Sequence, residues 1–188
     1  WPIAALDLEG LKALDAELLV RPAAIAIGAY KLEDPSVELI LRDGVLDMRR
    51  LTGRLFGGGL AMKMRLTASP KPAWQATMTM TGADLSKAVG LFPGQAFKGG
   101  LLDLEAELNA SGSSLQAMVN SLAGTVSVEM RQGIVSGFDL AGINQRIAAQ
   151  PDSIGLINLL TGGMSSGETR FTTLTGKLGI KDGIGRFD

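Results

Sequence analysis

The sequence predicts a mainly β domain of the α+β class, built on a curved, largely antiparallel sheet that forms a groove or an open sandwich. Three observations predict it: apolar and polar residues alternate along several segments, turn-forming residues separate these segments, and three or four short segments have helical periodicity. The helices are expected to cover or cap the sheet. With 188 residues, 46% of them apolar, the chain can bury a sizeable core.

Alternation with a period of two residues is the dominant signal along the chain. Successive side chains of a strand point to opposite faces, so each such segment has one apolar face and one hydrated face. Roughly ten strands at about 4.8 Å each would make a sheet on the order of 45 Å wide. The alternating segments are 60–66, 76–81, 102–109 and 126–131, with weaker versions at 14–18 and 37–41.

Turn chemistry supports hairpins between these segments. Glycine, asparagine and aspartate accept the positive φ angles of tight hairpin turns, and short sites rich in such residues separate the apolar runs. The expected turns are Asp43-Gly44, the glycines at 57–59, Gln132-Gly133 and Asp182-Gly183.

Helical periodicity replaces the alternation in a few short segments. The clearest is 113–122, which begins at Ser113 or Ser114 and has apolar residues at i, i+3, i+4 and i+7. Segment 83–91 has Asp84 as its capping residue. Two further helices are expected at 138–149 and 153–160.

Composition argues against most catalytic chemistry. The chain contains no cysteine and no histidine, which removes disulfides, thiolate nucleophiles and nearly all zinc, haem and histidine-base arrangements. Lys and Arg total 18 against 19 Asp and Glu, so the net charge of −1 offers no field for a nucleic-acid backbone. We therefore expect no enzyme, no cofactor, no metal and no nucleic-acid partner.

Two polar motifs could imitate functional sites. The glycines at 57–59 could cradle a phosphate, but a strand follows them instead of the lysine and helix that a phosphate loop needs, which favours a hairpin. Asp103, Glu105 and Glu107 share one strand face, as a carboxylate site would require. Their alternation with leucines indicates a solvated face instead.

The apolar side of the sheet is the main candidate for function, and it allows two interpretations. It is either an ordinary covered core, or a partly uncovered surface for lipid, since large exposed apolar patches usually meet a partner or a membrane component. Several methionines lie on it, and their flexible thioethers suit both a variable ligand and a packed core. The candidate lipid-contact residues are Leu60, Met62, Met64, Leu66, Met78, Met80, Leu102, Leu104, Val126, Val128 and Met130.

No segment reaches the roughly 20 consecutive apolar residues of a membrane-spanning helix, and the chain does not start like a signal peptide. It opens abruptly at Trp1 and ends just after the expected turn at Asp182-Gly183. We therefore expect a single domain over 1–188, with a sub-boundary near 81–98, that is a piece of a longer protein.

Four motifs follow one another in a fixed order in the second half of the chain. They are a strand that ends in a Ser-Gly turn (104–112), a helix start at Ser114-Leu115, a Leu-x-Gly step (122–124) and a Gly-x-apolar-x-Gly-apolar-Asp-Leu segment (133–140). In order and spacing, this region resembles the carboxy-terminal region of the AsmA family of bacterial envelope proteins, which also includes TamB-like and YhdP-like members. The aromatic-Gly-Gly hairpin at 55–59 and the strand pair at 171–183 extend the resemblance to 37–188.

The resemblance implies a periplasmic domain attached to the inner membrane by an anchor that precedes this segment in the full-length protein. It implies a function in lipid handling: a passive acyl-chain-binding segment of a phospholipid conduit from inner to outer membrane, which supports outer-membrane assembly. The implied partners are phospholipid acyl chains, other segments of the same protein, envelope-assembly proteins and the membrane. The alternative is a structural or protein-interaction module with a sealed apolar core that influences outer-membrane protein assembly.

Overall fold

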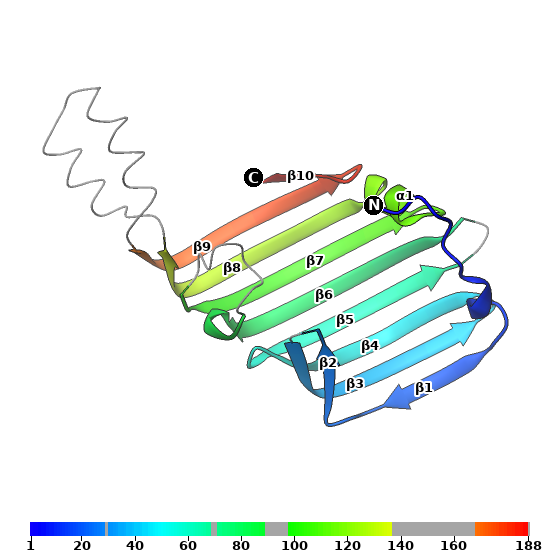
Figure 1. Cartoon of the computed structure of the whole chain (residues 1–188). Coiled ribbons are helices and arrows are strands. Elements are labelled where there is room, and N and C mark those ends of the chain that lie inside the picture. The colour runs from blue at the N-terminus through cyan, green and yellow to red at the C-terminus, as the bar shows by residue number, and fades with distance from the viewer. Residues whose placement is uncertain (29, 69–70, 89–97, 137–167, 188) are drawn as a thin grey trace, which may run out of the picture. The chain divides into compact units, whose positions relative to one another are not determined.

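The computed structural model describes residues 1–28, 30–68, 71–88, 98–136 and 168–187 (Figure 1). In this part of the chain, ten strands form one open antiparallel sheet in the order β1-β3-β4-β5-β6-β7-β8-β9-β10, and β2 also pairs with β3. The mainly β class and the antiparallel pairing are therefore confirmed. The strands are β1 (Ala16–Val20), β2 (Ala24–Ile27), β3 (Tyr30–Arg42), β4 (Val45–Leu55), β5 (Gly58–Thr67), β6 (Ala73–Asp84), β7 (Leu101–Ser111), β8 (Ala123–Ser136), β9 (Glu168–Lys181) and β10 (Ile184–Phe187).

The chain folds as two compact units. The first unit comprises Trp1–Ala83, Asp103–Glu129 and Thr175–Asp188, and the second comprises Asp84–Leu102 and Met130–Leu174. The first unit therefore contains β1 to β5 and nearly all of β6, and it is where most of the candidate lipid-contact residues lie.

Two of the predicted hairpin turns are confirmed. Asp43 and Gly44 have φ angles of 51° and 73° and join β3 to β4, while Asp182 and Gly183 have φ angles of 53° and 73° and join β9 to β10. Two consecutive residues with positive φ match the right-handed twist of the flanking strands, which is why such two-residue turns close hairpins tightly.

The hairpin between β4 and β5 turns one residue earlier than the sequence predicted. Phe56 and Gly57, with φ angles of 54° and 79°, form the turn, and the next two glycines already belong to β5. Gly58 is needed there for close packing, because a Cβ atom on it would lie 2.5 Å from the backbone of Thr81 and Ala83. The glycines at 57–59 therefore allow both the turn between β4 and β5 and the close packing of β5 against β6.

The predicted turn at Gln132-Gly133 is wrong. Both residues lie inside the continuous strand β8, where Gln132 has a φ of 54°. A Cβ atom on Gly133 would overlap the ring of Phe171, so the glycine makes room for an aromatic side chain of β9. The Gln-Gly pair therefore marks an irregularity within a strand and not its end.

The described residues contain fewer helices than predicted. They include one α-helix, α1 (Leu115–Asn120), and two short 3-10 helices, η1 (Glu9–Leu11) and η2 (Leu85–Lys87). The expected helix at 113–122 is confirmed, with Ser114 as its cap: its hydroxyl accepts from the amide of Ala117 at 3.1 Å. The helix expected at 83–91 is wrong over its described part, 83–88, where β6 continues to Asp84 and η2 follows it. Segments 138–149 and 153–160 lie outside the described residues.

The second unit has its own small core and a polar contact at its rim. Leu85, Leu102 and Met130 are buried in it. The Lys98 ammonium pairs with the Glu168 carboxylate at 2.7 Å, and the Lys98 amide donates to the carbonyl of Ile134 at 2.8 Å.

Candidate functional site: an apolar sheet face

The apolar face of the first unit is centred on the β5–β6 hairpin. In β5, Leu60, Met62, Met64 and Leu66 occupy alternate positions, so they share one side of the sheet. The antiparallel register sets each of them directly opposite an apolar residue of β6 on the same side. These pairs are Leu60 with Met80, Met62 with Met78, Met64 with Ala76, and Leu66 with Trp74.

The same face continues without a gap toward the β1 edge. Met64 lies opposite Met48 of β4, Met48 opposite Leu39 of β3, and Leu39 opposite Leu18 of β1. With Ala76, this row crosses five strands, or about 19 Å at a strand spacing of about 4.8 Å. A lipid tail lying across the strands would therefore meet apolar side chains over most of its length.

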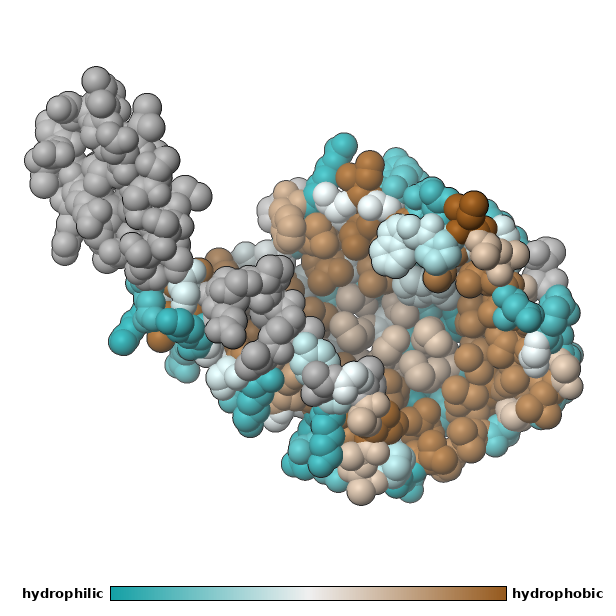
Figure 2. All heavy atoms as spheres, in the orientation of Figure 1, coloured by the Kyte–Doolittle hydropathy of each residue, from teal (hydrophilic) through white to brown (hydrophobic). Residues whose placement is uncertain are grey.

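The side chains on this face are only partly covered. The four apolar side chains of β5 are half-buried, as are Met48, Leu39 and Met78, while Leu18 of β1 is 48% exposed. Figure 2 shows apolar side chains gathered at the surface over β3 to β6. Among the predicted contacts on this face, Met80 is buried, at 7% exposure.

One end of the apolar face is bordered by α1 and the amino-terminal segment 1–15. The Leu6 amide donates to the carbonyl of Ser113 at 2.8 Å, and the Gln116 amide to that of Pro2 at 3.1 Å. Near β1, the Asp43 amide donates to Oδ1 of Asp15 at 3.1 Å. The segment thus passes from α1 along the strand ends to the β3–β4 turn (Figure 1).

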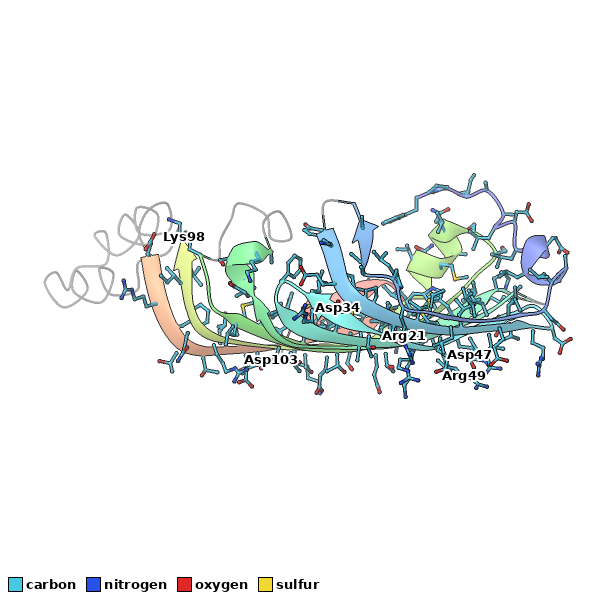
Figure 3. The ribbon with its side chains drawn as sticks, turned by 90° about the horizontal axis from the view of Figure 1, so that it is seen from below. Arg21, Asp34, Asp47, Arg49, Lys98 and Asp103 are labelled. Atoms are coloured by element: carbon cyan, nitrogen blue, oxygen red, sulfur yellow. The ribbon has the colours of Figure 1, made fainter. Side chains whose placement is uncertain are left out.

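The opposite end is bordered by a packed corner, which we define as Leu32, Pro35 and Gly53. Leu32 and Pro35 are fully buried, and the Leu32 side chain lies directly over Gly53. The cause is a β-bulge: Asp34 has a φ of 47°, and the β3–β4 register shifts at this point. β2 and the start of β3 therefore rise out of the sheet plane, on the side that carries α1 (Figure 3).

The other side of the first unit is polar. Asp47, Arg49 and Asp103 extend from the sheet on the side away from α1 (Figure 3). Shallow open hollows lie along it, one of about 710 Å³ lined by Lys63, Thr77 and other side chains of β4 to β7. Charges on this side form ordinary surface ion pairs.

One such pair shifts the pKa of a carboxyl group. The guanidinium of Arg50 donates to Oε2 of Glu38 at 2.9 Å and holds the pKa of that carboxyl below its usual range. Within the described ranges, no group of three or more His, Cys, Asp or Glu residues is arranged to hold a metal ion. Among the described residues, the side chains of the polar side are therefore hydrated or form surface ion pairs.

The remaining predicted contacts lie on β7 and β8. In the first unit, Leu104, Val126 and Val128 are half-buried. Leu104 alternates with Asp103 and Glu105 along β7, and Asp103 extends from the polar side, so Leu104 belongs to the apolar side (Figure 3). Leu102 and Met130 belong to the second unit and are buried there, at 4% and 6% exposure.

Sequence reasoning missed the β4 part of the face. Met48 and Leu51 both lie on it, opposite Met64 and Met62, although two residues stand between them instead of one. A register shift between these two pairs breaks the period-two pattern. The paired arginines at 49 and 50 were the available signal, because an extra polar residue in an alternating segment is typical of a bulge.

Fold and face together define a class of protein: a β-rich module built on one open sheet with a broad apolar surface. No described helix has the length and apolar character needed to cross a membrane.

The chain belongs to the AsmA family, whose family model matches residues 9–187. The resemblance drawn from the motifs is thereby confirmed. Members of this family are envelope proteins involved in outer-membrane assembly and are generally non-enzymatic. No curated protein and no solved structure matches the chain.

Proposed function

We propose that this domain is a passive acyl-chain-binding segment of a phospholipid conduit from the inner to the outer membrane. The observation that carries the proposal is the continuous row of apolar side chains from Leu18 to Ala76, which is only partly covered although it crosses five strands. Soluble domains rarely leave a contiguous apolar surface of this kind without a partner for it.

Burial of hydrocarbon is sufficient to drive such binding. An acyl chain of about 16 methylenes could supply roughly 13 kcal/mol if fully buried, at about 0.8 kcal/mol per methylene. A tail lying on an open face buries one side, so about half of this is a realistic value. Affinity in this range lets a lipid be held and released, as a conduit requires.

The residue types on the face favour tolerance over selectivity. Met48, Met62, Met64 and Met78 lie next to one another across three strands. Thioether side chains adapt their shape to a ligand, so chains of different length and unsaturation would bind similarly. Hydrocarbon burial needs no polar recognition, and head-group selectivity should accordingly be poor.

The proposed setting is the periplasm, in a longer protein that is attached to the inner membrane. Other segments of that protein and envelope-assembly proteins would be its further partners. The family membership supports an envelope location. The anchor and the partners are part of the proposal.

The second candidate is a structural or protein-interaction module with a sealed apolar core. The burial of Met80, Leu102 and Met130 favours it, because these three side chains are already covered by the protein itself. In this case, the half-buried residues of β5 would be the margin of a core and not a binding surface.

Lipid analysis of the purified protein separates the two. A conduit segment should copurify with phospholipid, seen by native mass spectrometry and solvent extraction, and should take up a fluorescent fatty acid that natural lipid displaces. A protein free of lipid that also excludes the fluorescent fatty acid would overturn the conduit and leave the sealed module.

A further inference from the structure

The β1 edge of the sheet is unusually apolar on both sides. Leu18, Leu19 and Val20 are 48%, 57% and 37% exposed, although Leu18 and Leu19 point to opposite faces. No strand of the described residues pairs with the outer edge of β1 (Figure 1). Natural edge strands are usually protected by charged residues, proline or a bulge, and Glu17 is the one such feature within β1.

We propose that β1 is a dimerisation edge, which pairs antiparallel with β1 of a second copy of this chain. With Leu18 opposite its own equivalent, Ala16 lies opposite Val20, and Glu17 opposite Leu19. The like charges of the two Glu17 residues are thus kept apart. The pairing is isologous, because each contact occurs twice about one two-fold axis.

Charge complementarity supports this occupant and this register. One residue beyond β1 at each end, the same alignment sets Asp15 of one copy opposite Arg21 of the other, twice per dimer. Arg21 has no ion pair or hydrogen bond within the described ranges. Asp15 accepts from the Asp43 amide through Oδ1, and its Oδ2 atom is available for a guanidinium. Opposite charges directly across a strand pair stabilise it.

The pairing would join two apolar faces. A two-fold axis perpendicular to the sheet keeps equivalent faces on the same side, so the row that begins at Leu18 would run on into the row of the second copy. The apolar face would double in width. The inference rests on the edge alone and stands whether or not the face binds lipid.

Disulfide trapping tests the contact and its register. The chain has no cysteine, so a single substitution gives an unambiguous reporter. Cβ atoms of directly opposed residues lie about 4.5–5.5 Å apart, close to the separation that a disulfide needs. Leu18→Cys should form a disulfide-linked dimer under mild oxidation. Ile184→Cys, at a 64% exposed position on the other edge strand, should give background only. Equal trapping at the two positions would overturn the proposal.

Sedimentation of the full chain tests the charges. The wild-type chain should show a concentration-dependent monomer–dimer equilibrium, and Arg21→Glu should raise its dissociation constant about tenfold, because two pairs become like charges. The double variant Asp15→Lys with Arg21→Glu should restore dimerisation, provided that circular dichroism shows it folded. Failure of the double variant to dimerise while folded would overturn the register.

If the wild-type chain stays monomeric at the highest concentration reached, the proposal of a dimer is overturned. The lipid-binding measurement decides the proposed function independently of this result.

Discussion

The packed corner and the centre of the apolar face both consist of apolar residues, but these residues are buried to different extents. In the packed corner, Leu32 is 1% exposed. On the apolar face, Met62 and Met64 are half-buried, although they stand in the middle of the sheet. Central position in a sheet therefore does not by itself make an apolar side chain part of a core.

The difference comes from the regularity of the backbone. At the packed corner, the bulge at Asp34 folds the start of β3 over the sheet, so that Leu32 meets Gly53. The β5–β6 hairpin keeps an unbroken register over its whole length, so its apolar side stays flat and accessible. At the packed corner the bulged strand covers its own apolar side chains, whereas the four apolar side chains of β5 in the regular β5–β6 pairing are only half-buried.

Truncation at the packed corner should have the largest effect on stability. Leu32→Ala leaves a cavity beside Gly53 and should lower the free energy of unfolding by about 2–5 kcal/mol in a urea titration. The matched truncation Met62→Ala on the apolar face should cost about 1 kcal/mol or less, because that side chain is half-exposed. Equal losses would erase the distinction between the two regions.

A charge on the apolar face should remove binding while the fold survives. Met64→Asp should weaken binding of a fluorescent fatty acid at least tenfold, or about 1.4 kcal/mol, since a carboxylate would have to lose water on contact with the tail. Lys63→Asp, one residue away on the polar side, is the control and should leave binding unchanged. If Met64→Asp simply unfolds the protein, Met64 belongs to the core.

Loss of the α1 cap should have a moderate effect confined to stability. Ser114→Ala removes the hydroxyl that accepts from the Ala117 amide and should lower the free energy of unfolding by about 1 kcal/mol. Thermal unfolding followed by circular dichroism measures this. Ser114→Asn retains a capping group and should recover most of the loss. A full loss in the asparagine variant would show that the hydroxyl does not act as a cap.

The smallest effect concerns pH and the polar side. Because Arg50 lowers the pKa of Glu38 in the folded state, the pair stabilises the protein at neutral pH, and this contribution is lost as pH falls through the folded-state pKa. NMR titration should give the Glu38 carboxyl a pKa below that of an ordinary glutamate. Arg50→Ala should raise this pKa toward the ordinary value. An unchanged pKa in the variant would show that another group causes the shift.

Local signals predicted the regular parts of the fold. Alternation at 60–66 and 76–81 predicted the faces of β5 and β6, and Asp43-Gly44 predicted the turn between β3 and β4. Ser114 marked the start of α1. Each of these features depends on residues that are close together in the sequence.

The missed features depend on residues that are far apart. From the sequence, Gly133 is predicted to be a turn residue. The structure shows that the ring of Phe171 occupies the space where a side chain at this position would lie. A helix was expected from residue 83, but β6 extends to Asp84. At this end of β6, the backbone of Thr81 and Ala83 packs closely against Gly58, which is far away in the sequence. The extent of cover over Met64 and Leu104 likewise follows from the tertiary arrangement, so alternation could name these residues but not their exposure.

An acyl-chain site on the apolar face is tested most directly by a pair of single-cysteine reporters on β5. Met62→Cys and Lys63→Cys, labelled with the environment-sensitive dye acrylodan, report on the two sides of one strand in a chain that has no other cysteine. Palmitate should change the dye emission saturably at position 62 and leave the emission at position 63 unchanged. Equal responses at both positions, or none at 62, would contradict an acyl-chain site on the apolar face.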